Sequence, residues 1–183
     1  GNYHVVNYDA ETGEVLNQAT CQGFSDNSAW ARGQAWAIYG YTMAYRETHR
    51  QDFLDMAVHT ADFWLNHPNL PEDGIPYWDF NAPDIPNTVR DASAAAIIAS
   101  ALIELSQLDN SIEAPKYLEY AKEQIRSLTS STYLAKPGTN GGFILRHSTG
   151  NYNKNSEVDV PLTYADYYYV EALLRLKKLQ NEN

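Results

Sequence analysis

Five segments of the chain carry patterns of apolar residues that predict α-helices, and the segments are of two alternating kinds. In the first, third and fifth, at 28–47, 91–107 and 161–179, apolar or small residues occur on every side and charges are few. A helix without a polar face is one that other elements surround. In the second and fourth, at 50–66 and 112–128, apolar residues form one stripe with charged residues off it. These two segments are predicted to lie on the outside.

The order inner, outer, inner, outer, inner indicates a repeat of helical hairpins. The inner segments RGQAWAIYGYTMAY, RDASAAAIIASALIEL and YADYYYVEALLRL also resemble one another. Two geometries fit, an open α-solenoid or a closed toroid with the inner helices at its centre. Inner helices without solvent faces favour the toroid. A closed ring of this kind, an (α/α)6 barrel, needs about six hairpins, so we predict an all-α fold that is about half of one.

Residues 3–24 precede the helices and contain two short β-like runs, YHVVNYD and EVLNQAT. Gly13 lies between them in a position where a turn calls for positive φ, so a small hairpin is predicted. A second irregular segment, HPNLPEDGIPYWDFNAPDIPNTVR, holds five prolines between 68 and 86. Long ordered loops of this kind are often functional.

Charge and composition exclude several classes of function. The net charge of −10 comes without a visible basic face, which argues against binding to nucleic acid or to an anionic membrane. The single cysteine, Cys21, excludes an internal disulfide framework. The sequence has no apolar run of about 18 residues, as a membrane-spanning helix would require. It also lacks the common metal-ligand and nucleotide-binding spacings, so no metal and no cofactor are predicted.

Arg32 is the unexpected residue, because it lies near the start of a buried helix with no other charge until Arg46. A buried cation needs a partner. That partner is either a structural carboxylate or an anionic group of a substrate bound at the positive end of the helix. If all inner helices start on the same side, then Arg32, Asp91 and Asp166 surround one mouth. Asp91 is also well placed to cap the third helix.

Several other residues near this mouth are candidates for binding a substrate, although a structural role is the commoner one for each residue type. Trp36 follows Arg32 by four positions and lies on the same face of the helix. Trp30 points elsewhere, toward the loop. Aromatic rings of this kind stack on sugars as well as filling cores. The remaining candidates are polar groups of the hairpin region and residues of the YWDF block, namely His4, Gln22, Trp78 and Asp79.

Several blocks together resemble a known family. QGFSDNSAWARGQAWAIYGYTMAYRET, YWDFNAP, RDASAAAIIASALIEL and NSEVDVPLTYADYYYVEALLRL strongly resemble glycoside hydrolase family 88, the unsaturated glucuronyl hydrolases, over nearly the whole chain. A sister family that acts on unsaturated rhamnogalacturonan has a similar W-x-R-G-x-x-W core. The YWDF and RDASAAAI blocks favour family 88.

The resemblance implies that residues 1–183 are the C-terminal half of a single (α/α)6 catalytic domain. The implied substrate is an oligosaccharide that a polysaccharide lyase has left with a 4,5-unsaturated uronic acid at its non-reducing end. An aspartic acid protonates C4 of the vinyl ether, water adds at C5, and the hemiketal collapses without a cofactor. The residues that match the family's substrate-binding positions are the polar pair, the cation and the aromatic walls: His4, Gln22, Trp30, Arg32, Trp36 and, at the rim, Trp78.

The family's catalytic aspartates lie upstream of the position that His4 matches, so none is expected in this chain. Half a toroid has exposed apolar flanks, and we expect the missing N-terminal half or a second copy of the chain to cover them. Two alternatives stay open: a hydrolase of the rhamnogalacturonan family, and a non-catalytic helical-repeat module that binds a partner. The sequence leaves the compartment open between bacterial cytoplasm and periplasm.

Overall fold

The structure is a computed structural model that describes residues 1–182 and consists of a hairpin followed by five α-helices. The hairpin comprises β1 (Val5–Tyr8) and β2 (Val15–Ala19), paired antiparallel with Val5 opposite Ala19. As predicted, Gly13 turns the hairpin with a φ of 74°. The helices are α1 (Ala31–Thr48), α2 (Gln51–Leu65), α3 (Ala92–Leu108), α4 (Ala114–Leu128) and α5 (Thr163–Glu182).

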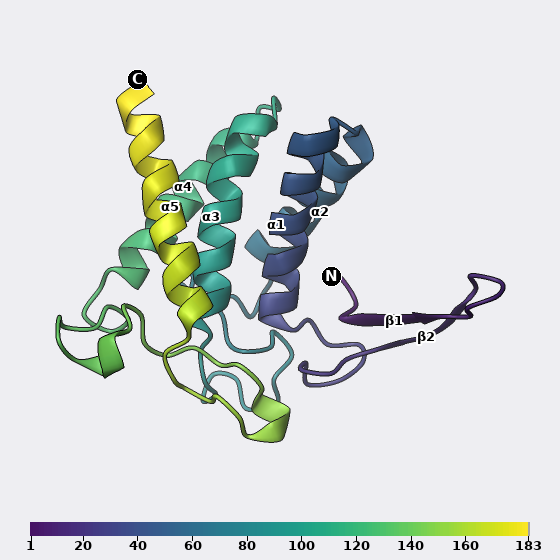
Figure 1. The fold of residues 1–183 in the computed structure, drawn as a ribbon, viewed down its shortest axis with the longest axis horizontal. Coiled ribbons are helices and arrows are strands. Elements are labelled where there is room, and N and C mark those ends of the chain that lie inside the picture. Colours follow the sequence, from purple (N-terminus) through teal and green to yellow (C-terminus); the bar gives the residue numbers. More distant parts are fainter. Residues whose placement is uncertain (183) are drawn as a thin grey trace.

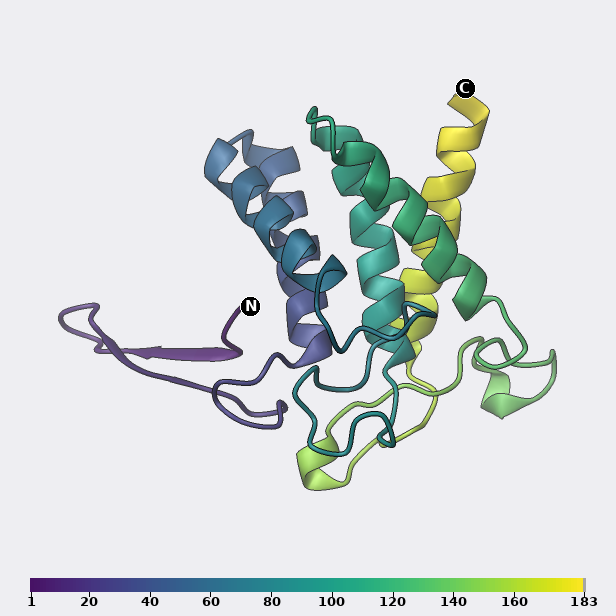
Figure 2. The same cartoon turned by 180° about the vertical axis from the view of Figure 1, so that it is seen from behind.

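The helices form two layers, in the predicted order. Helix α3 lies between α1 and α5 in the inner layer (Figure 1). From behind, α2 covers α1 and α4 covers α3 (Figure 2). Each inner helix runs in the same direction, so all three N-terminal ends meet the same set of loops at one end of the layer (Figure 1). That end is the predicted mouth.

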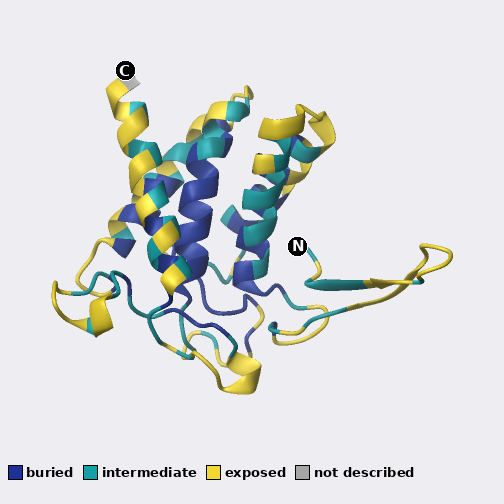
Figure 3. Cartoon of the chain, viewed as in Figure 1, coloured by how far each residue is buried: buried dark blue, intermediate teal, exposed yellow. Residues whose placement is uncertain are grey.

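Helix α3 is the centre of the core, because alanine and serine dominate its surface. Small side chains let helices approach closely, and α3 packs against α1, α4 and α5 at once. Nearly all of it is buried (Figure 3), whereas α2 and α4 each carry exposed residues as well as buried ones. The largest fully buried side chains of the core include Trp64 of α2 and Tyr117 of α4. Each burial of such a ring stabilises the fold by roughly 2–3 kcal/mol.

Helix α5 differs from the prediction, because one of its sides is exposed. Tyr167 and Leu174 are each 61% exposed, and Val170 and Leu173 lie between them, also exposed. The sequence reads as buried all round because these residues are apolar. Their exposure is nevertheless the flank expected of half a ring, since the next inner helix would lie there. Met43 on α1 and Met56 on α2 are exposed as well.

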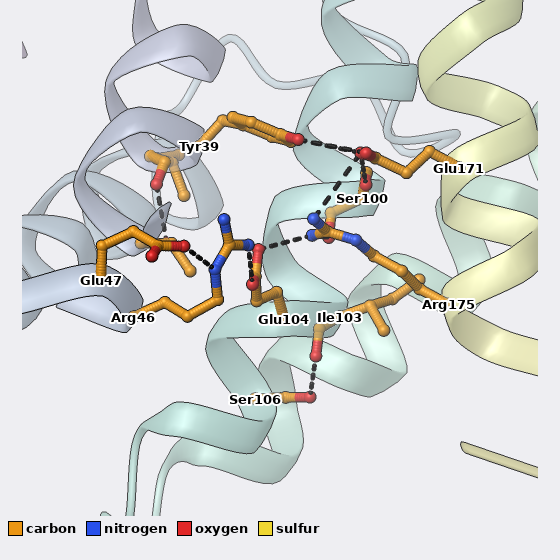
Figure 4. A network of polar contacts seen from close by, with 11 residues as sticks. Tyr39, Arg46, Glu47, Ser100, Ile103, Glu104, Ser106, Glu171 and Arg175 are labelled. Carbon is orange, nitrogen blue, oxygen red and sulfur yellow. Dashed lines mark hydrogen bonds and ion pairs between the residues drawn. The ribbon is translucent and has the colours of Figure 1, made fainter. Parts of the chain in front are cut away.

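The inner helices meet through a network of charges near the end opposite the mouth (Figure 4). Glu104 of α3 binds both Arg46 of α1, at 2.5 Å, and Arg175 of α5, at 2.8 Å. Glu171 of α5 accepts hydrogen bonds from Tyr39, at 3.2 Å, and from Ser100, at 2.5 Å. These contacts link the three inner helices on the side that the outer helices do not cover.

Several predicted boundaries are wrong by a few residues. The first helix begins at Ala31 rather than 28, because residues 29–30 pair with the 77–80 segment instead. The last begins at Thr163 rather than at 161, so Pro161 precedes the helix. It also continues past 179 to Glu182. No helix in the described part of the chain is long and apolar enough to cross a membrane.

Candidate functional site

The YWDF block positions the start of α1. Trp30 and Asp79 form an isolated β-bridge, and the Ala31 amide donates to the carbonyl oxygen of Trp78 at 3.1 Å. The Phe80 amide in turn donates to the carbonyl of Ala29 at 3.0 Å. A short stretch of extended pairing therefore replaces a side-chain cap at the N-terminus of α1. It holds Trp30 and Arg32 at the mouth end of the inner layer.

Arg32 has a structural carboxylate as its partner. Its Nη1 donates to Asp91 Oδ2 at 2.7 Å and to the Thr149 carbonyl at 2.5 Å, and its Nη2 donates to the Gly150 carbonyl at 2.6 Å. The two side chains of the ion pair are 4% and 0% exposed. The sequence analysis considered two partners for Arg32, a structural carboxylate and a substrate anion. In the structure, the structural carboxylate of Asp91 contacts it. The guanidinium also fixes the backbone of the loop before α5.

Asp91 is the predicted cap of α3 and is fully engaged. Its Oδ1 accepts from the Ser93 amide at 3.1 Å, from the Ser93 hydroxyl at 2.5 Å and from the Thr149 amide at 3.3 Å. With Arg32 on Oδ2, the carboxylate accepts four hydrogen bonds. Asp91 thus joins the start of α3 to the start of α1.

Trp30 is the centre of an aromatic and cationic stack. The imidazole of His4 stacks on its ring with centroids 4.4 Å apart. The Arg32 guanidinium carbon lies 4.6 Å from the centroid of the Trp30 ring and 5.4 Å from that of Tyr164. The hairpin, α1 and α5 therefore meet at this point, and three of the predicted site residues are in contact. Trp30 is buried by these neighbours.

His4 accepts hydrogen bonds and is therefore in its neutral form. Its Nδ1 lies 3.2 Å from the Cys21 amide and 3.3 Å from the Gln22 amide, and backbone amides can only donate. The ring proton must then lie on Nε2. Burial, with a smaller contribution from the positive charge of Arg32, lowers the pKa of His4 below its usual 6.5. The His4 ring keeps a neutral N–H donor.

Gln22 joins the same cluster through Gly150. Its Nε2 donates to the Gly150 carbonyl at 2.9 Å, and Arg32 donates to the same oxygen. One backbone carbonyl thus holds two of the predicted site residues, one from the hairpin region and one from α1. The sequence analysis did not predict a role for Thr149 and Gly150, because they act through backbone carbonyls, which every residue type has.

The other predicted residues lie outside this cluster. Trp36 meets Tyr168 of α5 edge to face at 5.1 Å, on the uncovered side of the inner layer. Trp78 is 2% exposed and lies beneath Tyr152, with ring centroids 4.4 Å apart. Asp166 of α5 accepts from the Ile144 and Leu145 amides, both at 2.8 Å, so it anchors a loop. Whether Trp36 and Trp78 contact a sugar stays a prediction.

Asp79 is a second buried carboxylate with a structural environment. Its Oδ2 accepts from the Ser28 hydroxyl at 2.6 Å and from the Phe24 amide at 2.9 Å, and its Oδ1 accepts from the Asn81 amide at 2.8 Å. These contacts hold the segment after the hairpin against the YWDF block. In the described residues, no group of three or more His, Cys, Asp or Glu side chains is arranged to hold a metal ion.

The comparisons with known proteins agree on one family. No family model matches the chain. An unsaturated glucuronyl hydrolase of Formosa agariphila is 53% identical over 177 residues, 97% of this chain and 44% of that protein. One from a Bacillus species is 39% identical over 97% of this chain and 47% of its own length. An unsaturated chondroitin disaccharide hydrolase of Streptococcus pneumoniae is 34% identical over 97% of this chain and 44% of its own length.

Solved structures give the same result. The chain superposes with a TM-score of 0.95 on the crystal structure of an unsaturated glucuronyl hydrolase specific for heparin, at 50% identity, covering 98% of this chain and 48% of that one. For the structure of the Bacillus enzyme, the TM-score is 0.89 at 34% identity, over 96% of this chain and 46% of that one. The chain thus spans about half the length of the relatives it matches.

Proposed function

The chain is a homologue of the unsaturated glucuronyl hydrolases of glycoside hydrolase family 88, and we propose that the protein to which it belongs has their activity. That protein releases a 4,5-unsaturated uronic acid from the non-reducing end of oligosaccharides that polysaccharide lyases generate. One observation carries the proposal beyond homology. His4, Gln22, Trp30 and Arg32 come from separate parts of the chain and converge where the three inner helices begin.

The cluster fits a uronate subsite of this kind. His4 keeps an Nε2–H donor, and Gln22 has an amide group that lies beside Gly150. Both are neutral, so they can hydrogen-bond sugar hydroxyls without a charge that competes with Arg32. The guanidinium supplies positive potential, and the N-terminal end of α1 adds to it. Arg32 acts in this proposal chiefly by orienting its neighbours, because both of its terminal nitrogens already hold protein oxygens.

The reaction needs a carboxylic acid that gives a proton to C4, and we propose that residues outside this sequence provide it. The two buried aspartates near the cluster are unsuitable. Asp91 accepts four hydrogen bonds and Asp79 accepts three. Their oxygens are thus held by groups of the protein itself, whereas a proton donor must reach the atom that it protonates. In this proposal the chain is the C-terminal half of the barrel and contributes binding groups.

The exposed flank of α5 also supports the proposal that this chain is one half of the barrel. Tyr167, Val170, Leu173 and Leu174 are all exposed and lie within about two turns of one helix, and adjacent exposed apolar residues often mark an interaction surface. We propose that the remaining half of the barrel covers this flank in the whole protein. A second copy of the chain is the alternative occupant. Both would complete an inner layer of which α1, α3 and α5 are one part.

Hydrolysis of an unsaturated disaccharide tests the proposed function directly. The substrate absorbs ultraviolet light through its conjugated C4–C5 double bond, and hydration abolishes this absorbance. The protein that contains this chain should remove the signal of an unsaturated chondroitin disaccharide. Arg32→Lys should slow the reaction, while Lys122→Arg on the exposed side of α4 should not. An unchanged signal with the whole protein would overturn the proposal.

The same assay separates the alternatives. Faster turnover of an unsaturated rhamnogalacturonan disaccharide than of the chondroitin disaccharide would assign the protein to the sister activity. Binding of either sugar without any loss of absorbance would favour a non-catalytic helical-repeat module. The burial of α3 speaks against that module, since a helix that is enclosed on all sides has no face for a partner.

A further inference from the structure

Two open depressions lie next to each other on the loops at the mouth end and share Thr88 and Tyr152. The first has a volume of about 330 Å³ and includes Phe24 and Asn153. The second has a volume of about 450 Å³ and includes Tyr133 and His147. The two depressions adjoin at Thr88 and Tyr152 and are together called the aromatic groove here. It is defined by Phe24, Thr88, Tyr133, His147, Tyr152 and Asp159.

The aromatic groove begins beside the proposed uronate subsite. Phe24 follows Gln22 by two positions, and Asn153 Nδ2 donates to the Gly23 carbonyl at 2.6 Å. The loop that holds Tyr152 is also the one whose Gly150 carbonyl binds Gln22 and Arg32. The groove wall and the subsite thus share their backbone. A ligand in the subsite would have the groove as its neighbour.

Tyr152 forms a rigid platform in the middle of the groove. Its ring stacks on Trp78 with centroids 4.4 Å apart and planes 16° apart. Trp78 is fixed in turn, since its Nε1–H donates to Thr88 Oγ1 at 3.2 Å and its backbone bonds both Ala31 and Val89. Tyr152 is 37% exposed. A supported aromatic ring with an exposed part is suited to a flat, weakly polar ligand surface such as the C–H face of a sugar.

The far end of the groove offers oriented hydrogen-bonding groups. His147 Nδ1 lies 2.7 Å from Asp159 Oδ1, and the Tyr133 ring meets the imidazole edge to face. Both members of the pair have positive φ, 63° at His147 and 53° at Asp159. Residues other than glycine rarely adopt this conformation, and it is concentrated at ligand-binding sites. The pairing leaves His147 Nε2 and the second Asp159 oxygen for sugar hydroxyls.

The charges of the groove select against an anionic ligand. Arg90, which lines the second depression, pairs with Asp73 at 3.0 Å and lies over Tyr77. His147 pairs with Asp159, and Asp84 adds another carboxylate to the first depression. Each lining residue that carries or can carry a positive charge therefore has a carboxylate partner. A sulfated or uronic acid ring would gain no free cation here, whereas an uncharged ring meets aromatic faces and neutral donors.

We propose that the aromatic groove is a second sugar-binding site, which holds uncharged sugar rings. The inference rests on the proposed function in one respect. These rings are the reducing-end part of an oligosaccharide whose unsaturated uronate occupies the subsite at His4, Gln22 and Arg32. The groove thereby favours substrates longer than a disaccharide and, at this position, unsulfated over sulfated sugars.

The test uses a neutral probe without any unsaturated uronate, so that it does not depend on catalysis. Chitotriose, a neutral trisaccharide of N-acetylglucosamine, is titrated into the protein that contains this chain, and binding is followed by isothermal calorimetry. We expect saturable binding that Tyr152→Ala weakens about tenfold or more, the effect of losing one stacking ring. Tyr152→Phe should keep the affinity within about twofold. Tyr8→Ala, at an exposed tyrosine of β1 outside the groove, is the matched control and should bind like the parent.

Phe24→Ala provides a second variant, because Phe24 is 47% exposed and substitutions of exposed residues usually change stability little. It should also weaken binding. The inference is overturned if chitotriose does not bind, if both variants bind like the parent, or if a sulfated chitooligosaccharide binds more tightly. Hydrolysis of the unsaturated disaccharide is measured in parallel. Hydrolysis without groove binding refutes this inference alone, and groove binding without hydrolysis refutes the proposed function alone.

Discussion

Arg32 and Asp91 lie 59 positions apart in the sequence, yet their side chains meet at 2.7 Å with almost no access to water. The pair joins the first turn of α1 to the cap of α3, and through Thr149 and Gly150 it also holds the loop before α5. This cation, the first charge of α1 and the only one in it before Arg46, is therefore a junction between three parts of the chain. Its removal affects the site through their positions.

Arg32→Met is expected to destabilise the protein by about 3–5 kcal/mol, because it leaves the Asp91 carboxylate buried without its partner. Chemical denaturation gives the free energy of unfolding. The matched control is Arg50→Met, which breaks a pair with Asp52 on the exposed surface. That change should cost less than about 1 kcal/mol. Equal losses for both variants would contradict the assignment of Arg32 as a buried junction.

Stability should decrease as pH falls through the normal titration range of histidine, and His4 should contribute to the decrease. Burial, then Arg32, lowers the pKa of His4 in the folded state below 6.5. The unfolded chain consequently binds the proton first, so acidification favours unfolding from about 6.5 downward. NMR titration of the imidazole should give a midpoint below 6.5.

His4→Gln should reduce the pH dependence of the unfolding free energy in this range. His67, whose pKa burial also lowers, supplies a comparison, because its variant should leave the His4 midpoint in place. A His4 midpoint at or above the normal value would show that the ring is not held as a neutral acceptor.

The exposed flank of α5 should make the chain associate when it is produced alone. Leu174→Asp places a charge in the middle of this flank and should shift the chain toward the monomer in sedimentation velocity. Ile112→Asp is the control, since Ile112 is 93% exposed in the connection between α3 and α4. If the parent chain is monomeric at all concentrations, the flank does not act as an interface between copies.

Glu171→Gln should lower the pKa of Tyr39, which is raised to about 12 in the folded protein. Burial is the larger cause and the Glu171 carboxylate the next, so the midpoint should fall without reaching the normal value of 10. NMR titration of the Tyr39 ring measures it. Glu47→Gln is the control, because Glu47 pairs with Arg46 and not with Tyr39. An unchanged midpoint would contradict the contact drawn in Figure 4.

The layer order could be predicted from the sequence because burial leaves a direct mark on composition. Segments with few charges became α1 and α3, and segments with one apolar stripe became α2 and α4. The exposed side of α5 was harder to predict from the sequence. An apolar residue that faces solvent in this chain is of the same residue type as one in a core, so only the structure tells the two cases apart.

The candidate site was predictable in its residue types and not in its contacts. Asp91 was expected as a cap, and the ion pair with Arg32 depends on how α1 and α3 pack. The carbonyl acceptors of Thr149 and Gly150 could not be predicted from the sequence, because every residue has a backbone carbonyl. Two acidic residues within the inner helices, Glu104 and Glu171, did carry a signal. A charge within an apolar segment requires a partner, and here the partners are Arg46, Arg175 and Tyr39.

The small side chains of α3 determine where this protein can tolerate amino-acid substitutions. A helix rich in alanine and serine has no spare volume, and all four other helices contact it. Adding a methylene there pushes on every neighbour at once, whereas the same change on the far sides of α2 or α4 meets only water. Natural and engineered diversity should therefore accumulate on the periphery, while the central helix changes little.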